Sequence, residues 1–175
     1  LPEFFSIEKT KEIKKKINLI LIKYIKQTLK FNKVFVHRDF HVENLILSKG
    51  KVCLIDNQDA VIGHPVYDLI SLIDDVRISL NKKDQDKIYN YYVLKNKKIP
   101  KEFNFHFHVL SIQRLLKILG IFVRLHRRDN KKKYLKYLTR TWKLVELRLN
   151  HQKLTDLNQL FSKYFTKDIR KKKWI

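Results

Sequence analysis

The sequence predicts a mostly helical α+β protein in which a small group of strands interrupts the helices. Apolar residues recur at helical spacing before residue 31 and again after residue 64. Between these regions, short apolar runs are separated by polar and turn-forming residues, as in strands. The chain has 175 residues, of which 44% are hydrophobic, which is enough for one core. We therefore expect a single domain over residues 1–175.

Residues 7–30 are expected to form one long amphipathic helix. Isoleucine, leucine and tyrosine recur every three or four residues, and lysines lie between them. The lysines could bind an anionic membrane surface. We favour the alternative, in which the helix packs beneath the polar loop that follows the first strand.

The central segment is typical of strands. Residues 34–36 form an apolar run, expected to be buried, and residues 45–47 and 52–55 flank the turn sequence Ser48-Lys49-Gly50. Cys53, the only cysteine, lies in the second arm of this predicted hairpin, so we expect it to be a small buried hydrophobic residue. A single cysteine also excludes an internal disulfide.

Five further helices are expected after the strands. Pro65 precedes the first of them, and Asp68 lies near its start, where the helix dipole favours an acid. Pro100 marks a loop. The helices are expected near residues 66–76, 84–92, 105–123, 134–149 and 154–164.

The net charge of +22 allows two interpretations. Such a chain attracts polyanions, so a nucleic-acid-binding module is one. The other is a compositional bias, because 30 lysines stand against 9 arginines and the lysines are dispersed along the helices. We favour the second, with weak non-specific polyanion binding.

The absence of 18 consecutive apolar residues predicts no membrane span, and the single cysteine fits a cytoplasmic location.

A polar motif follows the first strand. His37-Arg38-Asp39 is followed by Asn44, five residues after the aspartate, and then by Asp56. A carboxylate at Asp39 can take a proton from an attacking hydroxyl, while Asn44 and Asp56 offer oxygen ligands for Mg²⁺. Each residue also has a purely structural interpretation. Asp39 could be a loop acid paired with Arg38, Asn44 a turn amide, and Asp56 an acid at the end of a strand.

The predicted hairpin would fold Asp56 back beside Asn44, so that both could face one ion. His37 is expected to orient the loop by hydrogen bonding. Arg38, Asp59 and Arg114 are polar groups on segments expected to line the acceptor side, which makes them candidates to contact substrate. Arg114 could equally belong to a structural ion pair. The remaining histidines show no zinc-binding pattern.

These residues resemble the catalytic half of the aminoglycoside phosphotransferase family, relatives of protein kinases. Within that family, the sequence is similar to the branch of cell-wall amino-sugar kinases, which phosphorylate the anomeric hydroxyl of N-acetylmuramate or N-acetylglucosamine. The similarity covers roughly residues 5–145. Beyond the core motif it includes residues 55–60, 63, 67–69, 71–72, 113–114, 117–122, 124–125, 128–129 and 134–135.

The resemblance implies a protein-kinase-like C-terminal lobe that uses ATP and Mg²⁺ to phosphorylate a sugar. It also implies that Asp68 hydrogen-bonds the catalytic loop and holds it in shape. Family members carry the nucleotide on an N-terminal lobe with a phosphate-covering loop and a lysine. The 3 glycines of this chain all lie too late for that loop. We therefore expect the N-terminal lobe to be absent, and the chain to need it as a partner for activity.

Two other functions stay open from the sequence. One is a non-catalytic basic helical module that binds nucleic acid. The other is a kinase that acts on an aminoglycoside or another small alcohol.

Overall fold

The computed structural model describes residues 6–31, 33–96 and 99–171. These residues are mostly helical, with two small two-stranded sheets, which confirms the predicted secondary-structure content. The contacts of the chain separate it into two compact units. Unit 1 comprises residues 1–28 and 112–175, and unit 2 comprises residues 29–111. The expectation of one domain over the whole chain stays a prediction.

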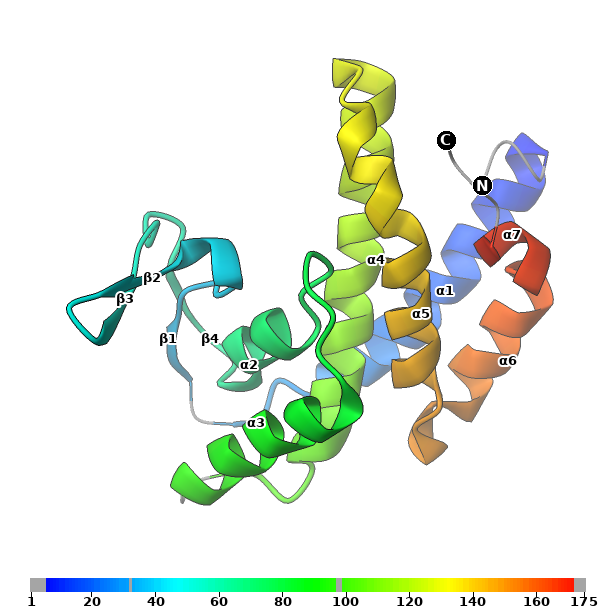
Figure 1. Cartoon of the computed structure of the whole chain (residues 1–175). Coiled ribbons are helices and arrows are strands. Elements are labelled where there is room, and N and C mark those ends of the chain that lie inside the picture. The colour runs from blue at the N-terminus through cyan, green and yellow to red at the C-terminus, as the bar shows by residue number, and fades with distance from the viewer. Residues whose placement is uncertain (1–5, 32, 97–98, 172–175) are drawn as a thin grey trace. The chain divides into compact units, whose positions relative to one another are not determined.

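Unit 2 contains both sheets. Strand β1 (Val34–Val36) pairs antiparallel with β4 (Val61–Gly63), a pairing that the sequence did not indicate. Strands β2 (Leu45–Ser48) and β3 (Lys51–Leu54) form the predicted hairpin, which projects from the helices of this unit (Figure 1). Lys49 and Gly50 both have positive φ, at 48° and 73°. A two-residue turn of this kind matches the right-handed twist of the strands.

The prediction of burial was wrong for two of the three residues of the run 34–36, and it was also wrong for Cys53. In β1, Phe35 is 61% exposed and only Val36, at 2%, lies in the core. In the hairpin, Leu47 and Val52 are mostly exposed, and Cys53 is exposed rather than buried. Each sheet has only two strands, so their apolar residues bury little of their surface. Strand propensity alone does not reveal whether another layer covers a sheet.

The helices of unit 2 pack around one apolar cluster. They are α2 (Val66–Ile73), α3 (Lys82–Lys95) and the first residues of α4 (Phe103–Asp129). Tyr92 of α3 stacks on Phe103 with ring centroids 5.8 Å apart, and its hydroxyl donates a 2.8 Å hydrogen bond to the carbonyl of Pro65. This bond fixes the start of α2, which carries Asp68. The buried residues of the cluster are Val66, Leu69, Ile70, Ile73, Phe103 and Phe107.

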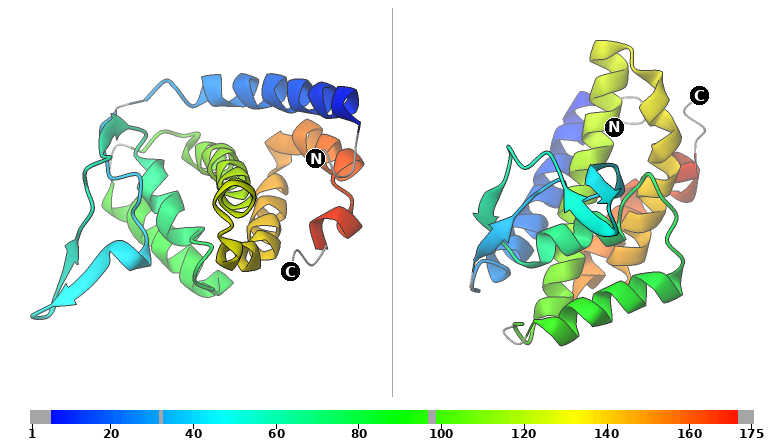
Figure 2. Two further views of the ribbon diagram at one scale, coloured as in Figure 1. Left: turned by 90° about the horizontal axis from the view of Figure 1, so that it is seen from above. Right: turned by 60° about the vertical axis from the view of Figure 1, so that its left-hand side comes forward.

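The regular elements that the structure describes in unit 1 are all helices. Helix α1 (Ile7–Gln27) begins at Ser6, whose hydroxyl accepts a 3.2 Å hydrogen bond from the Lys9 amide. It packs against α6 (Thr155–Tyr164), as Figure 2 shows. The Tyr24 hydroxyl donates a hydrogen bond to the Asp156 carboxylate between the two helices. The other elements are η2 (Lys132–Tyr137), α5 (Leu138–Leu149), η3 (Gln152–Leu154), α7 (Lys167–Lys171) and the rest of α4.

Helix α4 is the one helix among the described ranges that is long and apolar enough to cross a membrane. Half of its most apolar stretch is buried inside the protein, as in the core helix of many folded domains. The criterion rests on length and composition alone, and the expectation of no membrane span stays a prediction.

Candidate functional site

Asp68 holds the loop that follows β1. Its two carboxylate oxygens accept hydrogen bonds from the backbone amides of His37 and Arg38, at 2.7 Å and 2.9 Å. Arg38 has a φ of 75°, a conformation that non-glycine residues rarely adopt and that costs about 1 kcal/mol or more. The Ser71 hydroxyl also reaches the Arg38 carbonyl, at 3.5 Å. Helix α2 therefore supplies the contacts that offset the strained backbone of this loop.

His37 joins the same loop to the end of β3. The ring is buried, and its Nε2 atom lies 3.0 Å from the carbonyl oxygen of Ile55. A carbonyl can only accept, so Nε2 carries the proton and donates it. Ile55 directly precedes Asp56, and His37 lies two residues before Asp39. This bond thus links the chain segments that carry the two predicted acids.

The β2–β3 register brings Asn44 close to Asp56 in the fold. Leu45 pairs with Leu54, and the ladder continues because the Ile55 amide donates a 3.1 Å hydrogen bond to the Asn44 carbonyl. The Asn44 side-chain amide donates to the Asp39 carbonyl at 2.9 Å. Asn44 is buried, and its Nδ2 atom donates to the Asp39 carbonyl, which leaves Oδ1 as the atom available to a ligand.

Three oxygen groups here have no partner in the described part of the chain. The carboxylates of Asp39 and Asp56 form no hydrogen bond or ion pair with it, and both residues are exposed. Asn44 Oδ1 likewise accepts no hydrogen bond. Nearby acids differ, since Asp68 accepts two amides and Asp75 pairs with Arg77. Unpaired acids in a chain of +22 charge are candidates for a ligand cation or a reacting proton.

Carboxylate and amide oxygens are the ligands that Mg²⁺ prefers, and this ion usually takes only one or two of them besides water and phosphates. Asn44 and Asp56 fit that requirement. No group of three or more His, Cys, Asp or Glu side chains in the described ranges could hold a metal ion.

The three residues predicted to contact substrate are not all brought together. The Arg38 guanidinium donates a 3.2 Å hydrogen bond to the backbone carbonyl of Asp59, so these two are neighbours. The Asp59 side chain is exposed. Arg114 belongs to unit 1 and is only 6% exposed. Its role in substrate binding stays a prediction.

Two ion pairs of Arg77 near this loop were not predicted from the sequence. Arg77 pairs with Glu43 at 2.8 Å and with the buried Asp75 at 3.2 Å. Glu43 adjoins Asn44 in the short helix η1 (Val42–Asn44), so the two pairs, which we call the Arg77 bridge, tie this turn to the chain after α2. The sequence shows Asp74 and Asp75 shortly before Arg77, but it gives no signal that Glu43 is a second partner.

His41 lies in the same region and was also not assigned a role. Its ring is buried, and its Nδ1 atom has no hydrogen-bond partner in the part of the chain that the structure describes. Burial and the nearby Arg77 lower the pKa of His41, while Asp75, Asp39 and Glu43 act in the opposite direction. The ring is therefore neutral near neutral pH, and adds no positive charge beside Asp39.

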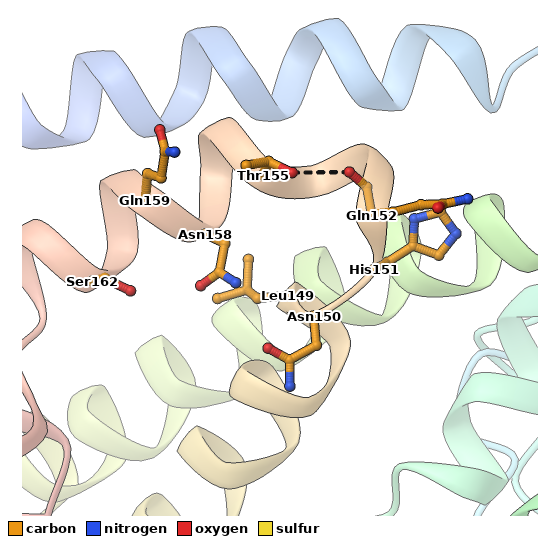
Figure 3. A pocket seen from close by; sticks show the side chains of 8 residues that line it. All are labelled: Leu149, Asn150, His151, Gln152, Thr155, Asn158, Gln159 and Ser162. Atoms are coloured by element: carbon orange, nitrogen blue, oxygen red, sulfur yellow. Dashed lines mark hydrogen bonds between the residues drawn. The ribbon is translucent and has the colours of Figure 1, made fainter.

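A pocket of about 250 Å³ lies in unit 1 and is separate from these residues (Figure 3). Neutral polar side chains from the end of α5, η3 and α6 line it, among them Asn150, Asn158 and Gln159. The dashed line in Figure 3 marks the hydrogen bond that the Thr155 hydroxyl donates to the Gln152 carbonyl. None of the predicted catalytic or metal-binding residues lines this pocket.

An unpaired loop acid, an amide oxygen and a second acid held by a hairpin are the groups that phosphoryl transfer uses. The chain belongs to the phosphotransferase enzyme family, whose model matches residues 3–93. This match confirms the resemblance found in the sequence, and it implies a kinase-like fold.

Three curated proteins that share one name are similar to this chain. The chain is 31% identical to an N-acetylmuramate/N-acetylglucosamine kinase of Caulobacter vibrioides over 144 residues, which are 79% of this chain and 40% of the relative. Proteins of the same name from Neisseria meningitidis serogroup B and Pseudomonas aeruginosa are 40% and 30% identical, over 58% and 79% of this chain. Those matches cover 33% and 43% of the two relatives. The chain thus spans about two fifths of their length or less.

Proposed function

We propose that this chain is part of an ATP-dependent kinase that phosphorylates the anomeric hydroxyl of a cell-wall amino sugar, N-acetylmuramate or N-acetylglucosamine. The observation that carries the proposal concerns side-chain oxygens of Asp39, Asn44 and Asp56 that have no partner among the described residues. These oxygens lie on segments joined by the hydrogen bonds of His37 and Asn44. The names of the similar proteins support the choice of sugar.

Asp39 is the group that orients the attacking hydroxyl and accepts its proton. Its carboxylate is exposed and unpaired within the described residues, while its backbone carbonyl is fixed by the His41 amide at 3.0 Å and by Asn44. The loop is thus held by its main chain, and the side chain stays available to substrate. Such positioning contributes much of the rate in phosphoryl transfer.

Asn44 and Asp56 are the residues that would hold Mg²⁺. An ion held by these two residues together with ATP would neutralise charge on the phosphates. The Asn44 side chain is oriented by its bond to Asp39, so the same contact sets the metal ligand and the catalytic loop. Asp56 has a φ of 64°, a strained conformation of the kind found at functional sites.

The acceptor is expected near Arg38 and Asp59, which are neighbours through the Arg38 side chain. A guanidinium can bind the carboxylate or the acetamide of an amino sugar by directed hydrogen bonds. Arg114 is the third residue proposed for this role.

The chain covers about two fifths of the length of its relatives or less, so we propose that turnover needs the remaining part, in cis or as a second polypeptide. The test joins this chain to the part of the Neisseria relative that the match leaves uncovered, and measures transfer from γ-labelled ATP. A panel of N-acetylmuramate, N-acetylglucosamine, other free sugars and aminoglycosides identifies the acceptor.

The expected result is phosphorylation of an amino sugar, its loss in Asp39→Asn with Mg-ATP binding retained, and loss of Mg-ATP binding in Asp56→Ala. Turnover on an aminoglycoside alone would contradict the choice of acceptor. Robust turnover by the 175-residue chain by itself would contradict the need for a partner. Mg-ATP affinity unchanged by Asp56→Ala would refute the metal site.

A further inference from the structure

The positive charge of the chain is concentrated in one of its two units. The sequence of unit 1 contains 26 Lys and Arg against 7 Asp and Glu, a net charge of +19. Unit 2 contains 13 against 10, a net charge of +3, and the two account for the total of +22. A compositional bias would act on both units, so it does not explain this difference. Such an asymmetry is typical of a surface that meets a polyanion.

Within unit 1, the solvent face of α1 combines this charge with exposed aliphatic side chains. The buried residues Thr10, Ile13, Leu21 and Tyr24 define the inner face of the helix. All seven lysines of α1 are exposed. Leu19 is 60% exposed, and Ile22 is 51% exposed.

Five residues of this outer face form a continuous row, which we call the α1 stripe: Lys11, Lys15, Leu19, Ile22 and Lys26. Steps of three or four residues keep them on one side of the helix, over a length of about 22 Å.

The lysines of the stripe are available to a partner. Lys11, Lys15 and Lys26 form no ion pair with any acid in the described part of the chain, whereas Lys9 and Lys16 both pair with Glu12. Three unpaired ammonium groups thus surround two aliphatic side chains that the fold leaves in water. The α1 stripe therefore presents positive charge and exposed aliphatic side chains on one face of the helix.

We propose that unit 1 docks on an anionic phospholipid bilayer through the α1 stripe. Ammonium groups lie at the level of the lipid phosphates, and aliphatic side chains between them reach the boundary of the acyl chains. A nucleic acid would use the same lysines for its phosphates but would gain little from Leu19 and Ile22. The aliphatic residues therefore favour the bilayer. With only two of them, binding is reversible and depends on anionic lipid.

The test is co-sedimentation of the 175-residue chain with vesicles of phosphatidylcholine, with or without about one third phosphatidylglycerol. Duplex DNA binding by the same proteins is measured in parallel. The first variant is Lys11→Gln/Lys15→Gln/Lys26→Gln, and the second is Leu19→Gln/Ile22→Gln. All five positions are exposed and glutamine favours helix, so the fold is retained, which circular dichroism checks.

The matched control is Lys83→Gln/Lys87→Gln/Lys95→Gln, which removes the same charge from exposed positions of α3 in unit 2. Each lysine near an anionic surface contributes about fivefold in affinity. We expect the triple α1 variant to bind anionic vesicles at least tenfold more weakly, and the control to change binding less than twofold.

The aliphatic variant decides between partners. We expect Leu19→Gln/Ile22→Gln to lose about tenfold in affinity for anionic vesicles and to keep its affinity for DNA. Vesicle binding that is unchanged in this variant would show a general polyanion surface and overturn the proposal. Equal binding to vesicles with and without phosphatidylglycerol would overturn it as well. No arm of the test uses catalysis, so its outcome is independent of the proposed kinase function.

Discussion

Replacing Asp68 by asparagine removes a carboxylate that binds two backbone amides at once. Both oxygens are engaged, with the amides of His37 and Arg38 at 2.7 Å and 2.9 Å. Asparagine has one acceptor oxygen, and its NH₂ group would face the second N–H as donor against donor. The substitution therefore keeps one hydrogen bond, loses the other, and removes the negative charge from both.

The free-energy cost of Asp68→Asn follows from the loss of one of these two hydrogen bonds. A hydrogen bond to a charged group contributes about 1.5–3 kcal/mol, and leaving a part-buried N–H without a partner costs a similar amount. We expect Asp68→Asn to lower the free energy that holds this loop closed by roughly 2–3 kcal/mol. The strained φ of Arg38 adds to the tendency to open, because nothing else in α2 except Ser71 contacts the Arg38 backbone in the described residues.

Hydrogen exchange at the two amides measures this directly. A loss of 2–3 kcal/mol corresponds to exchange about 30- to 160-fold faster at His37 and Arg38. Asp59→Asn is the matched control, because Asp59 contacts Arg38 only through its backbone carbonyl. Unchanged protection in Asp68→Asn, or equal losses in both variants, would refute the view that α2 holds the loop through this carboxylate.

Two further outcomes follow from unit 2. Burial and the neighbouring His106 lower the pKa of His64 to about 3, and its Nδ1 accepts the Val66 amide at 3.0 Å while its Nε2 lies 3.1 Å from His106 Nδ1. The unfolded chain then binds the proton more readily, so stability falls as the pH drops below the ordinary value of 6.5. At pH 5, urea unfolding should show a free energy of unfolding about 1 kcal/mol lower, after allowance for solvent screening. This loss should be smaller in His64→Asn, and an equal loss in that variant would contradict the assignment of the effect to His64. Because Cys53 is exposed, iodoacetamide should modify the native protein almost as fast as the unfolded one, and strong protection in a mass-spectrometric time course would contradict the exposed hairpin.

The helices and the hairpin were accessible from the sequence because their signals are local. The spacing of apolar residues placed α1, α3 and α6 within a few residues of their ends, and Ser48-Lys49-Gly50 located the turn. The pairing of β1 with β4 and the exposure of Cys53 depend on contacts between distant segments. No period or turn signal encodes such contacts.

The residues of the candidate site also divide into those that local sequence singles out and those that depend on contacts between distant segments. Residue type and spacing were enough to single out Asp39, Asn44 and Asp56. The Arg77 bridge was not predictable, since it joins Glu43 to Asp75 across more than thirty residues of chain. The concentration of charge in unit 1 was also hidden, because that unit combines both ends of the sequence.

Paramagnetic relaxation by Mn²⁺-ADP is the most direct test of whether Asp39, Asn44 and Asp56 share one binding site, since it detects weak binding by this chain alone. We predict selective broadening of the backbone amide signals of these three residues, lost in Asp56→Ala and kept in the control Asp86→Ala on the exposed face of α3. Broadening that misses these signals, or that persists undiminished in Asp56→Ala, would contradict the account.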